Sequence, residues 1–324
     1  MHKKRWGLNK GIALFCGAAA IGGALAVGRY GVTWPGGWTE EMKNVVFRIR
    51  LPRVGAAMLI GGALSLSGAV YQGIFRNPLV SPDILGVSSG ASVGAAGAIL
   101  LGLGPWGIEA CAFLGGLAAV MISLALPRIL KNSSAFMLVL AGILSGGFMN
   151  ALLGGLKYVA DTEMELAAIV YWTMGSLASC RPAQVALFGP WMLFSIFVLL
   201  ALRWKINILS LGDSEAYSLG VHAAKMRLTL VIFATALTSF AVSLAGTIGW
   251  VGLVIPHLGR LLGGDDNRSA LPVSVFLGGE FLLIADTLAR NLAPSEIPLS
   301  ILTGLIGTPL FVGLLFRRRL RIAE

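Results

Sequence analysis

Ten apolar runs follow one another along this chain, separated by more polar stretches. Most are long enough to cross the hydrocarbon core of a bilayer as a helix. Hydrophobic residues make up 56% of the sequence and charged residues 12%, against about 25% charged in soluble domains. Mean hydropathy is +0.82. One soluble core could not bury so much apolar surface, so we predict an all-α polytopic membrane protein, a single domain over residues 1–324.

The eighth of these runs is short for a full crossing and begins among Gly246, Gly249 and Gly252. Its start is expected to be irregular, which a membrane tolerates only where protein or a cavity shields the backbone. The ten expected spans, with approximate ends, are 11–28, 54–74, 84–103, 108–126, 135–156, 183–202, 228–246, 248–262, 271–289 and 299–316.

The distribution of basic residues indicates an orientation. With both termini inside, the inner loops hold 17 of the 25 Lys and Arg residues and the outer side holds 8. This bias of about two to one favours cytoplasmic termini under the positive-inside rule. The net charge of +10 therefore needs no nucleic acid as a partner.

The N-terminus also has features of a secretory signal peptide. Basic residues from Lys3 precede an apolar run that ends in Ala24-Leu-Ala26, a sequence similar to a cleavage site. We expect an uncleaved first span instead, because cleavage would leave nine spans and an even total suits the charge bias.

Cysteine and histidine are too scattered for a metal site. Cys16, Cys111 and Cys180 lie in or beside apolar segments with no C-x-x-C pair, which also argues against a disulfide. His257 stands alone in its segment, and a metal site needs more ligands. A transported metal is therefore expected to arrive inside an organic chelate.

Two apolar runs rich in Gly, Ala and Ser flank a short polar segment, Arg76 to Asp83. Small residues let helix backbones approach closely in a bilayer. The Asn and Pro between the runs end one helix and shape the start of the next. From Arg50, the stretch begins with RLPR and continues to YQGIFRNPLVSPDILGVSSGA, which ends at Ala91.

This stretch resembles the FecCD family of ABC-importer permeases, whose pattern is RLPR followed by YQ-x-x-x-RNPLA-x-P-x-x-LG-x-x-x-GA. Val80 replaces the usual Ala. Later segments match further family patterns, with Trp250 in place of Phe and Ser300 in place of Gly. These segments are GWVGLVIPHLGR from Gly249, ADTLAR from Ala285, and the run from Glu296 to Phe311.

The resemblance implies a fold like that of the cobalamin permeases and a place in the bacterial plasma (inner) membrane. It implies the permease of an ATP-driven importer for a ferric siderophore, haem, cobalamin or another metal chelate. The path is expected between two copies in a homodimer, with a heterodimer of paralogues left open. Other implied partners are a cytoplasmic ATPase dimer and an extracytoplasmic substrate-binding protein.

No enzyme motif occurs in this chain. It lacks the G-x-x-x-x-G-K-[ST] phosphate loop, and it has no nucleophile elbow and no H-E-x-x-H. We therefore expect that it is not an enzyme and binds no cofactor, and that ATP and Mg²⁺ bind to the separate ATPase.

A long polar loop at about 203–227 joins the sixth and seventh spans. In the FecCD family the corresponding loop forms the coupling helices that dock on the ATPase; the alternative is a solvated loop. Ser214 or Asp213 can cap a short helix, with Ala216, Leu219 and Tyr217 on one side. The expected coupling residues are Gly212, Asp213, Glu215, Ala216, Leu219, Gly220 and Val221.

Four residues are expected along the transport path. Asn77 and Leu79 match family positions near the cytoplasmic gate, and Ser134, before the fifth span, is expected to join them. Asn150 lies in the fifth span, which lines the path in the family. Its glycine neighbours are equally consistent with close helix packing, which stays open as the alternative.

Three arginines are expected on the outer side, against the positive-inside bias: Arg50, Arg53 and Arg290. At matching positions in the family, basic residues receive carboxylates of the binding protein, and an arginine fork suits that role. The alternative is that Arg50 and Arg53 reach lipid head groups while Arg290 pairs with Asp286, four residues earlier on one helix face.

Three residues inside spans have open roles. Pro256 frees a carbonyl one turn back, which His257 or another polar group could satisfy; the alternative for His257 is a role in gating. Glu280 is an intramembrane carboxylate where the family has a small or apolar residue, so it is either a paired structural acid or part of the path. With Glu280 as the coupling group, an ion-coupled secondary transporter is the second functional hypothesis.

Overall fold

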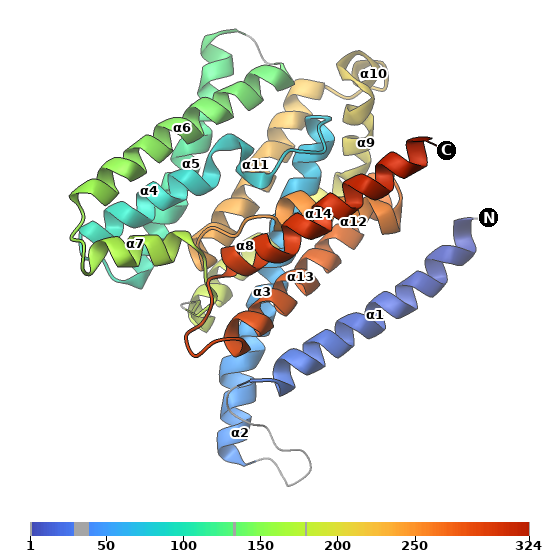
Figure 1. The fold of residues 1–324 in the computed structure, drawn as a ribbon. Helices are drawn as coiled ribbons and strands as arrows, with labels where there is room; N and C mark the ends of the chain where they lie inside the picture. The colour runs from blue at the N-terminus through green and yellow to red at the C-terminus, as the bar shows by residue number, and fades with distance from the viewer. Residues whose placement is uncertain (1, 29–38, 132–133, 179, 324) are drawn as a thin grey trace.

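Helices account for the regular structure in the computed structural model, which describes residues 2–28, 39–131, 134–178 and 180–323 (Figure 1). No strand occurs in this part of the chain. The long helices are α1 (His2–Ala26), α3 (Leu51–Ile74), α4 (Val87–Leu100), α5 (Pro105–Ile129), α6 (Ala135–Val159), α8 (Pro182–Ala201), α11 (Ala223–Ala245), α12 (Val251–Gly263), α13 (Asn267–Asn291) and α14 (Leu299–Ala323).

Short helical segments connect them. They are α2 (Glu40–Asn44), η1 (Val45–Arg50), η2 (Pro82–Leu85), α7 (Glu165–Thr173), α9 (Arg203–Leu211) and α10 (Asp213–Ser218). The start of α1 and the end of α14 lie toward the same end of the bundle as α10, while α2 and α7 lie toward the other (Figure 1). We call these two ends the α10 face and the α7 face.

The prediction of ten spans is confirmed, with one helix for each. Six segments are long and apolar enough to cross a membrane, and α1, α4, α12 and α14 supply four shorter apolar helices. The third span is shorter than expected, because α4 has only 14 residues, about 21 Å. Gly86 (φ 78°) and Gly102 (φ 65°) lie on either side of it in the left-handed region.

The expected irregular start of the eighth span is also confirmed. The backbone between Gly246 and Trp250 is not helical, and α12 begins at Val251. Trp250 has φ 70°, an unusual conformation for a residue with a Cβ. It packs against Gly307 of α14, where an added Cβ would lie 2.9 Å from that of Trp250.

Helix α3 is the centre of the molecule. In its most apolar window 83% of the residues are buried, against 28% in α6 and in α8, which are therefore peripheral. Glycine allows this burial: a Cβ at Gly61 would overlap the Gly278 carbonyl oxygen of α13, and one at Gly68 would overlap that of Gly252 in α12. The close backbone approach predicted from small residues is thus present.

Candidate functional site

A buried ion-pair network lies at the α7 face, where α3 begins and α13 ends. The Arg53 guanidinium contacts two carboxylates: Nη2 lies 2.8 Å from Asp286 Oδ1 and 2.7 Å from Glu296 Oε2. Further hydrogen bonds, from Nε to Asp286 and from Nη1 to Glu296, make both contacts bidentate. The Asp286 side chain is fully buried, so Arg53 pairing offsets the cost of removing this charge from water.

The other two arginines predicted on this side belong to the same region. Arg290 Nε lies 3.2 Å from Asp286 Oδ2, the i,i+4 pair proposed from the sequence. Arg50 donates from Nη1 to the carbonyl oxygens of Leu25 (2.7 Å) and Ala26 (3.0 Å), so it holds the end of α1. The structure therefore brings Arg50, Arg53 and Arg290 to one end of the bundle.

These arginines are engaged inside the chain. Arg50 is 4% exposed and Arg290 is 9% exposed. Little of either side chain is accessible to a carboxylate of another protein, which favours the alternative of internal pairing for Arg290. Neither alternative for Arg50 and Arg53 anticipated that they would bind the end of α1 and two carboxylates of this chain. Docking of a binding protein stays a prediction. Glu296, the second partner of Arg53, was visible from the sequence only as part of a motif.

A second polar cluster fixes the loop between α3 and η2 at the α10 face. Gln72 donates from Nε2 to the carbonyl oxygens of Val80 (3.1 Å) and Leu253 (3.2 Å). Arg260 of α12 donates to Gln72 Oε1. His257 Nε2 lies 2.9 Å from the Pro78 carbonyl oxygen. The loop is therefore tied directly to α12 through His257 and to α3 through Gln72, which itself bonds to α12.

His257 links α12 to the loop and to α14. Its Nε2 lies at the Pro78 carbonyl oxygen, and its ring contacts the edge of Phe311 with centroids 5.3 Å apart. The carbonyl that Pro256 leaves without its helical partner belongs to Gly252, and it packs on Gly68 of α3. Gln72 and Arg260 were within the recognised motifs, but sequence reasoning assigned them no role.

The predicted gate residues occupy the loop that this cluster fixes. Asn77 Oδ1 accepts a hydrogen bond of 3.0 Å from the Leu79 backbone N–H, which closes a tight turn. The Leu79 side chain is 61% exposed. Ser134 caps α6 by accepting from Met137 N at 3.2 Å. The expectation that Ser134 lies with Asn77 and Leu79 at one gate stays a prediction.

Asn150 is remote from Ser134. It lies 16 residues after Ser134 along α6, about 24 Å at helical rise. Its side chain is exposed on the surface of the single chain, as is Phe148 at 57%. An exposed face of this kind is available to lipid or to a second protein chain, so a place on the path stays a prediction.

The long loop at 203–227 forms two short helices, α9 and α10, before α11 begins. Gly212, with φ 141°, is the N-cap of α10, and no side chain caps that helix. The capping prediction is therefore wrong: Asp213 Oδ1 instead pairs with Arg227 Nη2 at 2.7 Å, and Ser214 donates to Glu215 Oε2 at 2.8 Å. Glycine suits this cap position because a φ of 141° is unfavourable for a residue that has a Cβ.

The exposed surface of α10 is small and partly apolar. Ala216 is fully buried, whereas Tyr217 is 72% and Leu219 58% exposed, so the three residues that were predicted on one side differ in their burial. The chain turns at Gly220, with φ 76°, and Val221 N donates back to Ala216 O at 2.9 Å. The exposed Glu215 carboxylate accepts hydrogen bonds from the Glu215 backbone N–H and from Ser214, and these hold its pKa below the usual range.

Helix α9 is attached to the start of α13. Asn207 Nδ2 donates to Asp266 Oδ1 at 2.6 Å, and Asn207 Oδ1 accepts from Asn267 N at 3.0 Å. The Arg268 guanidinium lies 4.2 Å from the centre of the Trp204 ring, a cation–π distance. Force applied to α9 would therefore reach α13 directly.

Glu280 lies on α13 opposite α1. It is 8% exposed, and among the described residues Oε1 has no hydrogen-bond partner. A Cβ added at Gly17 of α1 would lie 3.1 Å from this oxygen. The expected structural pairing is therefore not seen among the described residues. The described residues also contain no group of three or more His, Cys, Asp or Glu that could hold a metal ion.

Comparison with known proteins gives a consistent result. The model of the FecCD transport family matches residues 12–317. The molybdate import permease MolB of Haemophilus influenzae is 39% identical over 306 residues, 91% of each chain. The hemin transport permease HmuU of Yersinia pestis is 38% identical over 315 residues, 95% of this chain and 93% of HmuU.

A solved structure is similar over the whole fold. It is described as an inward-facing conformation of a metal-chelate type ABC transporter, and its chain is 39% identical with a TM-score of 0.88. The match covers 94% of this chain and 97% of that one. The arrangement of α1 to α14 is therefore that of a known transporter.

Proposed function

The chain belongs to the FecCD transport family and is the permease subunit of an ABC importer, and we propose that its cargo is an iron chelate or a related metal chelate. A ferric siderophore or haem is the first choice, with cobalamin as the related case. The observation that carries this proposal is the similarity to the hemin permease, which extends over 95% of the chain. The metal-chelate transporter with the same fold supports it.

Molybdate is the rival cargo, because the molybdate permease is similar over 91% of the chain. The two classes differ in size and charge: an organic chelate is large and partly apolar, whereas molybdate is a compact oxyanion. Uptake into proteoliposomes that contain the permease, its ATPase and its binding protein would separate them. We expect ATP-dependent uptake of labelled ferric siderophore, haem or cobalamin. ATP-dependent uptake of molybdate alone would contradict the proposal.

The assembly is a homodimer with the path between the two copies, one ATPase dimer on the cytoplasmic side, and a binding protein on the other. ATP and Mg²⁺ bind to the ATPase, and this chain binds no cofactor. The large exposed apolar side chains of α6 and α8, such as Phe148 and Phe197, support burial against lipid or a second copy. Native mass spectrometry of the purified complex should find two identical permease chains, and two different permeases would contradict the homodimer.

The α10 face is cytoplasmic in this proposal, and the membrane is the bacterial plasma (inner) membrane. Residues Gly212 to Val221 form the contact with the ATPase, because α10 presents Tyr217 and Leu219 outward beside the acidic Glu215. Asn77, Leu79 and Ser134 belong to the inner gate, and Asn150 to the wall of the path. Cysteines at Asn77 and Leu79 should cross-link between copies in one nucleotide state only; equal cross-linking in all states would contradict the gate.

The binding protein docks on the α7 face near Arg50, Arg53 and Arg290. Arg53 is the best placed of the three, because its side chain is 15% exposed and its partner Glu296 is 25% exposed. Replacement of Arg53 by Glu should weaken binding of the substrate-binding protein, most strongly at low salt, where charge attraction is least screened. Unchanged affinity in a folded, ATPase-active complex would contradict docking here.

The second hypothesis, an ion-coupled secondary transporter, does not fit membership of an ABC-importer permease family. Glu280 therefore has no ion-coupling step to perform. Its position between α13 and α1 supports a role in how those two helices pack.

A further inference from the structure

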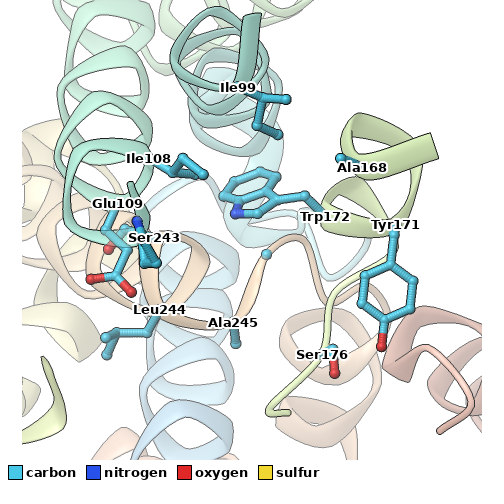
Figure 2. A pocket seen from close by; sticks show the side chains of 12 residues that line it. Ile99, Ile108, Glu109, Ala168, Tyr171, Trp172, Ser176, Ser243, Leu244 and Ala245 are labelled. Carbon is cyan, nitrogen blue, oxygen red and sulfur yellow. The ribbon is translucent and has the colours of Figure 1, made fainter. Parts of the chain in front are cut away.

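A cavity of about 280 Å³ lies under α7 at the α7 face. Its walls come from the end of α4, the start of α5, the C-terminal half of α7 and the end of α11. Figure 2 shows Glu109 and Ser243 on one side and the rings of Trp172 and Tyr171 on the other. Most of the remaining wall is apolar, with Ile99 and Ile108 among it.

The carboxylate of Glu109 is the feature of this cavity that packing does not explain. Glu109 is 7% exposed, and Oε2 has no hydrogen-bond partner among the described residues. Gln184 of α8 lies within hydrogen-bonding reach of this carboxylate and Arg181 attracts it electrostatically, but neither partners Oε2 among the described residues. A buried carboxylate oxygen without a partner is costly, so it indicates a group that arrives from outside the chain.

The serines of the cavity do not supply that group. Ser243 donates its hydroxyl to Phe240 O at 3.0 Å. Ser176 Oγ accepts from Ala178 N at 3.0 Å. Neither serine donates to Glu109 among the described residues, so a ligand that brings its own hydrogen-bond donor would complete the carboxylate.

We propose that this cavity binds a primary ammonium group carried on a small or apolar body. A protonated amine can donate a charge-assisted hydrogen bond to Glu109 Oε2. The faces of Trp172 and Tyr171 attract cations, and the isoleucines cover carbon. A phosphate or carboxylate would be repelled by Glu109, and a single carboxylate is too few ligands for a metal ion.

A primary ammonium group can reach the α7 face from two sources. One is the ethanolamine head group of a phospholipid, because the cavity lies at helix ends, where aromatic residues meet the head-group layer of a membrane. The other is a dissolved alkylamine. The cavity plays no part in the proposed cargo path or in ATPase coupling, so this inference does not depend on the identity of the cargo.

Two binding measurements on the full chain in nanodiscs test the proposal. In the first, native mass spectrometry compares retention of phosphatidylethanolamine and phosphatidylglycerol. In the second, calorimetry compares n-butylamine with n-butanol, which matches it in size and lacks the charge. Glu109→Gln keeps the shape of the side chain and removes its charge. Glu163→Gln is the matched control, because Glu163 is an exposed acid just before α7 that does not line the cavity.

The wild type should retain phosphatidylethanolamine over phosphatidylglycerol, or bind butylamine over butanol. Lipid retention alone identifies the head group as the source, and butylamine binding identifies a dissolved amine. Glu109→Gln should weaken the positive result about tenfold, whereas Glu163→Gln should not. No preference for the amine in either arm, or equal binding by Glu109→Gln, overturns the proposal. If Glu109→Gln does not fold, the two wild-type comparisons still decide it.

Discussion

Arg53 on α3 donates three hydrogen bonds to Asp286 on α13, although the two residues are 233 positions apart. The contact joins the start of the central helix to the end of its main packing partner. Arg290 and Glu296 complete the charges around it. The network therefore sets the register of α3 against α13 at one face of the membrane domain.

Removal of the Asp286 carboxylate should lower the stability of the folded chain severely. Asp286→Asn would leave Arg53 and Arg290 without their shared buried partner, and breaking a buried pair typically costs about 3–5 kcal/mol. Thermal unfolding of the purified chain should show a large fall in midpoint. Glu40→Gln breaks the exposed Lys43–Glu40 pair near the same face and is the control, with an effect of about 0.5 kcal/mol or less. Equal shifts would show that the network adds no stability.

Loss of the His257 bond should loosen the loop that holds Leu79. His257→Phe keeps a ring against Phe311 but loses the hydrogen bond to Pro78 O, about 1 kcal/mol. Hydrogen exchange in residues 77–80 should therefore speed up about fivefold. His222→Phe changes an exposed histidine outside this cluster and should leave the exchange unchanged. Unaltered exchange in His257→Phe would mean that Gln72 alone fixes the loop.

A side chain at Gly220 should uncouple transport from ATP hydrolysis. Gly220 has φ 76° and open space around it, so Gly220→Leu strains the end of α10 without a clash, at about 1–2 kcal/mol. In the reconstituted importer, uptake per ATP hydrolysed should fall about tenfold or more. Glu215→Lys should act in the same direction by reversing an exposed charge on α10.

Gly102 provides a matched control for this prediction. It also has a positive φ (65°) and nothing near its Cβ position, but it follows α4, whose C-terminal end is at the α7 face. Gly102→Leu should carry a similar backbone strain and leave coupling intact. Equal loss of coupling in both variants would assign the effect to general destabilisation.

The start of α13 should be sensitive to acid. Asp266 Oδ1 accepts from Arg268 N at 2.8 Å and from Asn207, and these bonds hold the pKa of Asp266 below its usual range. A lowered folded-state pKa means that the stabilisation is complete above the unfolded value of about 3.9 and is lost as pH falls through the folded value.

Two variants separate the cap from the charge. Asp266→Ala should lower stability at pH 7 by about 1 kcal/mol, whereas Asp266→Asn, also a good cap, should be nearly neutral. The difference in midpoint between wild type and Asp266→Asn should be constant above pH 5. Below that it should change in favour of Asn as the wild type loses its carboxylate bonds. A constant difference down to pH 2 would exclude Asp266 as the titrating group.

The spans could be predicted because each depends on a local property, a long apolar run. The irregular start of α12 could be predicted for the same reason, from its glycines. Local properties also misled. Asp213 and Ser214 are good capping residues, but Asp213 forms an ion pair with Arg227 and does not cap the helix. Gly212 is the N-cap, and its φ of 141° suits glycine.

The charge networks could not be predicted, because their partners are far apart in sequence. Nothing near Arg53 indicates Glu296, and nothing near Gln72 indicates Arg260. The sequence located all four residues in motifs, yet only the packing of α3 against α12 and α13 decides which of them meet. For the same reason, the burial of Arg50 and Arg290 could not be predicted from the sequence.

The 233-residue separation of Arg53 and Asp286 has a consequence for biogenesis. A ribosome adds about 5–20 residues per second, so α3 waits roughly 10–50 s before α13 has been synthesised. During that interval Arg53 lacks both of its carboxylate partners, and Gly61 of α3 has no α13 backbone against it. The face of α3 that packs on α13 must therefore stay in lipid, or beside an insertion factor, until almost the last helix arrives. A ribosome that stops before residue 286 would leave the membrane with a helix whose arginine has no counter-ion.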